Sequence, residues 1–81
     1  MDGRLQRPRM TALLKKRSFT LSRHRTSVAL EAEFWVVLEA QAAKEGVSLS
    51  AFVAGIDAAR GARPLASALR LRALAAGNRL A

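Results

Sequence analysis

The sequence contains no cysteine and only one histidine, His24. Without thiols the chain can form neither a disulfide nor a thiolate metal site, and a single histidine cannot hold a metal ion by itself. The sequence also has no Gly-rich phosphate loop and no serine elbow, and its acidic residues are scattered. We therefore expect no enzyme activity, no cofactor and no metal site.

Long apolar runs are missing as well. The longest wholly apolar stretch is Phe34–Leu38, which is far shorter than the roughly 20 residues that a membrane-spanning helix needs. No apolar segment typical of a signal peptide follows the basic start of the chain. These features predict a cytoplasmic protein with no membrane partner.

Acidic residues are scarce where basic residues gather. The net charge is +8, and residues 1–25 hold eight of the fourteen Lys and Arg residues, with Asp2 as the only acid. Such a segment predicts a polyanionic partner, nucleic acid first and an anionic membrane surface second, or else a solvated arm. Residues 1–15 show no sustained periodicity, so we expect a flexible basic tail there.

The chain is too short to bury a large core. With 81 residues it holds one small domain, and without disulfides such a domain is commonly stabilised by oligomerisation. The size alone therefore predicts a dimer.

Residues 17–30 have the alternating pattern of extended strands. Thr26, Val28 and Leu30 share one face, whereas Arg25, Ser27 and Ala29 share the other. A strand just ahead of two amphipathic helices needs an edge partner, because a lone hairpin is marginal in water. We expect that partner to be the same strand of a second copy, which would bury the first of these two faces.

A helical period begins at Ala32. The first helix should stop at Gly46, Ser48 should cap a second helix that ends near Arg60-Gly61, and Pro64 should open a third that stops at Gly77-Asn78. Apolar spacing predicts core positions in the first two helices, with Trp35 buried by the dimer; they are Phe34, Trp35, Leu38, Phe52, Val53 and Ile56.

These segments, in this order, resemble the ribbon-helix-helix family. The similarity is closest to a bacterial group of short proteins, and it rests on His24-Arg25-Thr26-Ser27, Phe34-Trp35, the turn at residues 46–50, and Leu65 with Ser67–Arg70. It implies a mostly α fold with a short N-terminal β-ribbon, an intertwined homodimer and an extra C-terminal helix. The expected divisions are a tail at 1–15, the ribbon-helix-helix domain at 16–60, and a short helix with a tail at 61–81.

The resemblance implies an obligate homodimer whose paired ribbons enter the major groove of double-stranded DNA. Base reading then falls to the open ribbon face, with Arg25 as the best candidate beside Ser27 and Ala29. Phosphate contacts fall to the start of the second helix and to basic residues near the ribbon; these are Ser48, Leu49, Ser50, Lys15, Lys16, Arg17, Arg23 and His24. The sequence departs from the group by having Arg23 where a glycine is expected.

The function expected from these features is sequence-specific regulation of transcription by a repressor that occupies its operator. One alternative is an antitoxin that binds its own operator with the ribbon and a toxin partner with its C-terminal part. A less favoured alternative is a membrane-surface protein, because the basic segment has the pattern of a strand rather than of a basic amphipathic helix.

Overall fold

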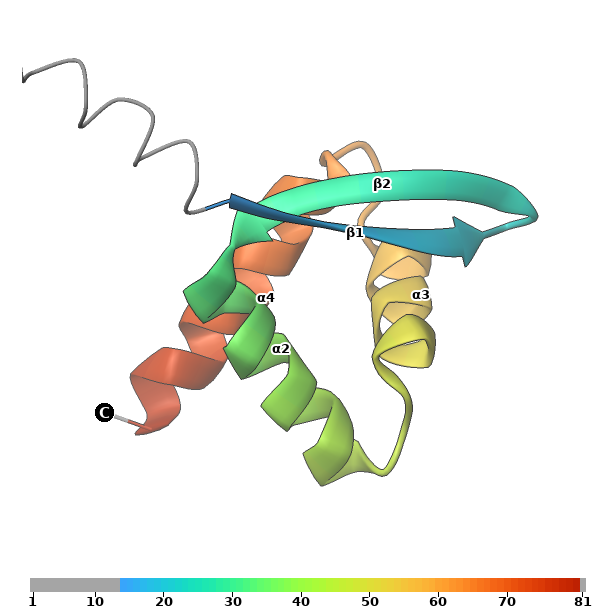
Figure 1. Cartoon of the computed structure of the whole chain (residues 1–81). Helices are drawn as coiled ribbons and strands as arrows, with labels where there is room; N and C mark the ends of the chain where they lie inside the picture. The colour runs from blue at the N-terminus through green and yellow to red at the C-terminus, as the bar shows by residue number, and fades with distance from the viewer. Residues whose placement is uncertain (1–13, 81) are drawn as a thin grey trace, which may run out of the picture.

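A β-hairpin and three helices follow one another along the chain. The computed structural model describes residues 14–80, with the side chains of residues 14–77. The elements are β1 (Leu14–Leu21), β2 (His24–Glu31), α2 (Ala32–Glu45), α3 (Leu49–Ala59) and α4 (Leu65–Leu80) (Figure 1). The predicted class, mostly α with a short N-terminal β-ribbon, is confirmed. Of the expected tail, residues 1–13 lie outside the described residues, and Leu14 and Lys15 belong to β1.

The two strands pair with each other inside one chain. They form an antiparallel sheet whose register runs from Leu14 opposite Glu31 to Leu21 opposite His24. The expectation that β2 needs the strand of a second copy in order to be buried is therefore wrong: Val28 and Leu30 are 5% and 0% exposed in the single chain. The physical reason is the two-residue turn, since closing so short a loop costs little entropy.

The hairpin turn explains why a glycine is expected at position 23. Ser22 and Arg23 both have positive φ, at 51° and 69°. Left-handed backbone at both central residues is typical of the type I′ turn, whose twist matches that of the flanking strands. Glycine adopts this conformation without the steric cost that a Cβ atom brings. Arg23 is therefore held in a strained conformation.

Replacing Arg23 with glycine should stabilise the folded state on the order of 1 kcal/mol, because it removes the steric cost of the Cβ atom. The greater conformational freedom of glycine in the unfolded chain offsets only part of this gain in stability. Urea denaturation of both proteins at equal concentration measures the change. The control is Arg23→Ala, which removes the same charge and keeps the Cβ atom. If both variants shifted the free energy of unfolding equally, charge rather than backbone strain would be responsible.

The helices begin and end at the predicted signals, with one exception. Gly46 closes α2 in a left-handed conformation, and the Ser48 hydroxyl caps α3 by accepting from the Ala51 amide at 3.0 Å. The predicted stop at Gly77-Asn78 is wrong, because α4 continues to Leu80. A glycine inside a helix costs only about 1 kcal/mol relative to alanine, and the surrounding alanines favour helix.

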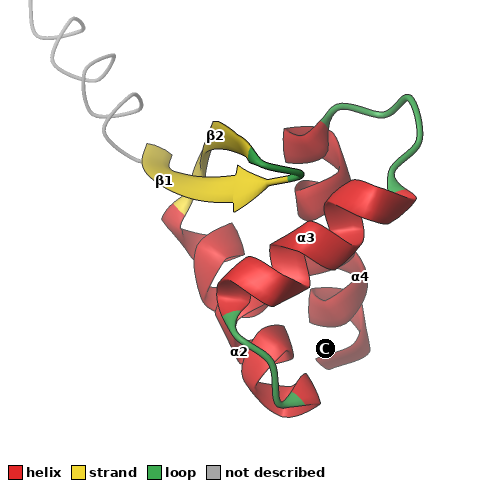
Figure 2. Cartoon of the chain, turned by 90° about the vertical axis from the view of Figure 1, so that its right-hand side faces the viewer, coloured by secondary structure: helices red, strands yellow, loops and turns green. Residues whose placement is uncertain are grey.

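One hydrophobic core joins the hairpin to all three helices. Figures 1 and 2 show the hairpin lying across one side of the helices. Of the predicted core, Thr26 and Phe34 are only half-buried, whereas the other seven are buried. The core also takes residues from β1, α2 and α4 that were not among the predicted core positions; these are Phe19, Leu21, Ala42, Leu65, Leu69 and Ala73.

Trp35 connects α2 to β1. It is 1% exposed, so the expectation that a dimer would bury it is wrong: its own chain does so. The indole Nε1 donates a hydrogen bond to the Lys15 carbonyl oxygen at 2.8 Å, and the ring lies 5.9 Å from the Phe19 ring, centroid to centroid. The Arg17 guanidinium lies 5.3 Å from the centre of the indole ring. These contacts fix the basic first strand against the helices.

Candidate nucleic-acid interface

The outer face of the hairpin is the side that the helices do not cover. Directly paired residues of an antiparallel sheet point to the same side, and the inner side carries the buried residues Phe19, Leu21, Val28 and Leu30. The outer face therefore carries three cross-strand pairs along its middle, namely Lys16 with Ala29, Ser18 with Ser27, and Thr20 with Arg25, and a fourth pair, Leu14 with Glu31, at the end away from the turn. Of the six residues in the three middle pairs, five are exposed and Ala29 is half-buried.

The chemistry of this outer face suits contact with a polyanion. The six residues include two cations and no carboxylate, with Lys16 and Arg25 toward opposite ends of the hairpin. The Ser18 and Ser27 hydroxyl oxygens lie 2.9 Å apart in the middle of the face. A two-stranded ribbon fits the major groove, where hydroxyls and guanidinium groups can bond to base edges.

The three residues predicted to read bases, Arg25, Ser27 and Ala29, do lie together on this face. The sequence reasoning missed Ser18 and Thr20, which β1 brings beside them. The alternation of apolar and hydroxyl residues from 18 to 22 was a visible signal for a strand. It did not show which strand would lie opposite.

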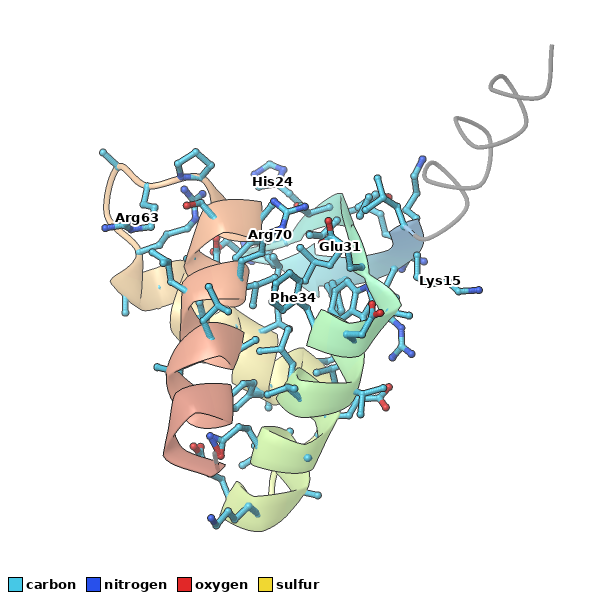
Figure 3. The ribbon with its side chains drawn as sticks, turned by 90° about the vertical axis from the view of Figure 1, so that its left-hand side faces the viewer. Lys15, His24, Glu31, Phe34, Arg63 and Arg70 are labelled. Atoms are coloured by element: carbon cyan, nitrogen blue, oxygen red, sulfur yellow. The ribbon has the colours of Figure 1, made fainter. Side chains whose placement is uncertain are left out.

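The basic residues of the hairpin divide between its two sides. Lys16 points outward, and Arg23 and His24 are exposed at the turn end of the hairpin. Lys15 lies at the other end of the hairpin (Figure 3). Because Lys15 and Arg17 are the neighbours of Lys16 along β1, both point to the inner side. The Arg17 guanidinium pairs with the Glu39 carboxylate, besides lying over the Trp35 ring. The structure therefore does not bring Lys15 and Arg17 to the outer face.

Comparison with known families agrees with this arrangement. The sequence profile of the family described as "Ribbon-helix-helix domain" matches residues 14–76, which span the hairpin, α2, α3 and most of α4. The chain belongs to the ribbon-helix-helix family. No curated protein and no solved structure gave a significant match. Proteins of this family generally bind DNA as dimeric regulators, so DNA-binding regulation is the kind of function indicated here.

The start of α3 in this ribbon-helix-helix chain has free backbone amides and no acid in its first turn. However, in Figure 1 this end of α3 is the one farther from the hairpin. The single chain therefore does not bring Ser48, Leu49 and Ser50 together with the outer face of the ribbon.

The end of the ribbon is tied to α4 by an ion pair. Glu31 is the last residue of β2, and its Oε1 lies 3.2 Å from Arg70 Nε (Figure 3). A hydrogen bond from its own backbone amide lowers the pKa of the Glu31 carboxyl, and Arg70 lowers it to a smaller extent. Desolvation acts in the opposite direction, but the pKa remains below its usual value. The only acid of the two strands is thus held by the domain itself.

Between residues 14 and 80, no helix has the length and apolar character to cross a bilayer. Within the same residues, no three or more His, Asp or Glu side chains gather where they could hold a metal ion.

Proposed function

We propose that this protein binds double-stranded DNA in a sequence-specific manner and represses transcription by occupying its operator in the bacterial cytoplasm. The proposal rests on one observation: the three middle pairs of the outer face of the β1–β2 ribbon are basic and free of carboxylates, and five of their six side chains are exposed. The one carboxylate of the two strands, Glu31 at the end of this face, is paired with Arg70. The six middle residues carry no negative charge that would repel phosphates, and their hydroxyls and guanidinium can bond to bases.

The proposed roles follow the position of each side chain on the ribbon. Arg25 reads a guanine through two parallel hydrogen bonds, Ser27 contacts a base or a phosphate, and Ala29 leaves room for a thymine methyl group. Lys16 attracts the phosphate backbone together with Arg23 and His24, whose side chains are exposed. The first turn of α3 is a second proposed phosphate site, because its amides and helix dipole favour an anion.

We further propose that the protein acts as a homodimer on a palindromic site. Two observations support this: the family is generally dimeric, and each strand of the two-stranded sheet has one edge without a strand partner among residues 14–80. Light scattering of the protein, free and bound to DNA, measures the assembly. A single protomer on the saturated operator would contradict the homodimer and leave base reading by the ribbon intact.

The decisive experiment compares Arg25→Ala with Lys16→Ala on a selected duplex and on variants of it with one base pair changed. Arg25→Ala should lose about 1–3 kcal/mol on the preferred sequence and discriminate less at one base position, because it removes a base contact. Lys16→Ala should weaken binding to all duplexes alike and lower the salt dependence by about one counterion, because it removes a phosphate contact.

The matched control for both variants is Lys44→Ala, which removes a positive charge from the exposed last turn of α2. Its affinity should stay close to that of the unaltered protein, and gel shift or fluorescence anisotropy at several salt concentrations measures all three. If Arg25→Ala and Lys44→Ala behaved alike on every duplex, the ribbon would not be the reading surface.

Two alternatives find less support. An antitoxin that neutralises its toxin with a disordered C-terminal tail is disfavoured, because the segment after α3 forms α4, which packs Leu65, Leu69 and Ala73 into the core of its own domain. A membrane-surface protein is expected to present a basic amphipathic helix, whereas the basic residues 14–25 form the hairpin.

A further inference from the structure

A shallow groove of ≈ 510 Å³ lies between α3 and α4. Its apolar lining is contributed by both helices, through Ile56 and Ala59 of α3 and Ala68, Leu71 and Ala75 of α4. Leu71 is 46% exposed there, although it is a large apolar side chain. None of the six middle residues of the outer ribbon face lines this groove, so the proposed DNA contact leaves it unused.

Arginines from three parts of the fold also line the groove: Arg60 at the end of α3, Arg63 in the following loop and Arg72 in α4. Arg60 is fixed by Asp57, whose Oδ1 lies 2.7 Å from its Nε. Arg72 lies 4.9 Å from the centre of the Phe52 ring and 3.3 Å from a Glu45 carboxylate oxygen. These contacts hold two of the guanidinium groups at the groove.

Arg63 differs from the other two arginines. Figure 3 places it on the loop that precedes α4, and it is exposed. Among the ion pairs of the described residues, none includes the Arg63 side chain. The groove therefore offers an apolar surface together with a guanidinium that has no carboxylate partner in the described part of the chain.

We propose that this groove binds an amphipathic helix of a partner protein, with acidic residues beside its apolar face. A groove between two helices is a common receptor for the apolar side of a third helix. The arginines then select carboxylates on the incoming helix, since complementary charge gives such contacts their specificity. The site is separate from the ribbon, so the partner can be held while DNA is bound.

Charge and lining disfavour the other occupants. A second copy of this chain, itself at +8, would bring the same arginines close to one another across a two-fold axis. Residues 1–13 of the chain carry Arg4, Arg7 and Arg9 against Asp2 alone, so they also have the wrong sign. A nucleic acid backbone would meet the arginines but would gain nothing from the apolar lining.

The test uses the full chain and a fluorescent peptide of about 18 residues, long enough to form a helix, with leucines at helical spacing and glutamates on the other face. Fluorescence anisotropy should show saturable binding. Leu71→Glu should weaken it at least about tenfold, because the change places a carboxylate in the groove. The matched control Leu74→Glu alters a leucine of the same helix that is 49% exposed and does not line the groove, and its affinity should change less than about twofold.

A second pair of variants isolates the charge. Arg63→Glu should weaken binding of the acidic peptide by about tenfold. Lys44→Glu, with the same change in net charge at the end of α2, should leave the affinity nearly unaltered. A peptide with lysines in place of the glutamates should not bind. Arg25→Ala on the ribbon should keep full affinity for the acidic peptide, so failure of the DNA proposal and failure of this one are distinguishable.

Several results would overturn the proposal. One is equal binding of a scrambled acidic peptide, which would indicate unspecific attraction to a basic protein. Equal losses in Leu71→Glu and Leu74→Glu would show that the groove is not the site. If Leu71→Glu instead lowered the solution mass, the occupant would be a second copy; if it lowered only the affinity for duplex DNA, the occupant would be nucleic acid.

Discussion

Replacing Trp35 with alanine is expected to destabilise the fold by about 3–5 kcal/mol, the usual cost of removing a large buried aromatic side chain. Trp35 is 1% exposed, and its loss removes the contacts with Phe19 and Arg17 as well as the hydrogen bond to the Lys15 carbonyl. A domain of this size is commonly stable by only about 5–15 kcal/mol, so the effect is a large part of the total. Urea denaturation at fixed protein concentration measures it.

Trp35→Phe separates the two parts of this effect. It keeps an aromatic ring and removes the indole N–H, so the loss should be smaller than for alanine. Hydrogen-exchange protection of the β1 amides should fall in both variants, because the Trp35 contacts hold the first strand against α2. A loss below about 1 kcal/mol for Trp35→Ala would contradict the role assigned to this side chain.

Leu69→Ala is the second change with a large expected effect, about 2–5 kcal/mol. Leu69 is 0% exposed and belongs to the same core as residues from the hairpin, α2 and α3. The substitution therefore leaves a cavity where α4 meets the rest of the domain. The free energy of unfolding and the cooperativity of the transition, both from urea denaturation, are the measurements.

The control for Leu69→Ala is Leu74→Ala in the same helix. Leu74 is 49% exposed, so this change should stay within about 0.5 kcal/mol of the unaltered protein. Equal effects of the two substitutions would indicate that α4 contributes through helix formation alone. A two-step transition in the unaltered protein would indicate that α4 unfolds separately from the rest.

The helical part of the fold could be predicted from the sequence because its signals are local. Gly46 and Ser48 mark the boundary between α2 and α3 by their own conformations, and the spacing of Phe52, Val53 and Ile56 gives the buried face of α3. By contrast, the end of α4 could not be placed from Gly77, since one unfavourable residue does not outweigh a run of strong helix formers.

The partner of β2 could not be predicted, because no local signal identifies it. Ser22-Arg23 lacks the Asn or Gly residues that usually mark a two-residue hairpin turn. Lys15, Lys16 and Arg17 interrupt the apolar alternation of β1, and the strand depends on distant contacts such as the one from Trp35. The β2 half of the outer face was therefore predicted correctly, while Ser18 and Thr20 were missed because their position depends on the register.

Because the hairpin forms within one chain, it affects how the occupancy of a DNA site should depend on the concentration of the protein. When two chains must meet before any reading surface exists, half-site occupancy at low abundance rises with the square of the protomer concentration. Here one chain already holds both strands, so half-site occupancy is expected to rise in simple proportion to concentration. If two protomers meet only on the duplex, the steepness of the response comes from that encounter on DNA rather than from assembly in solution.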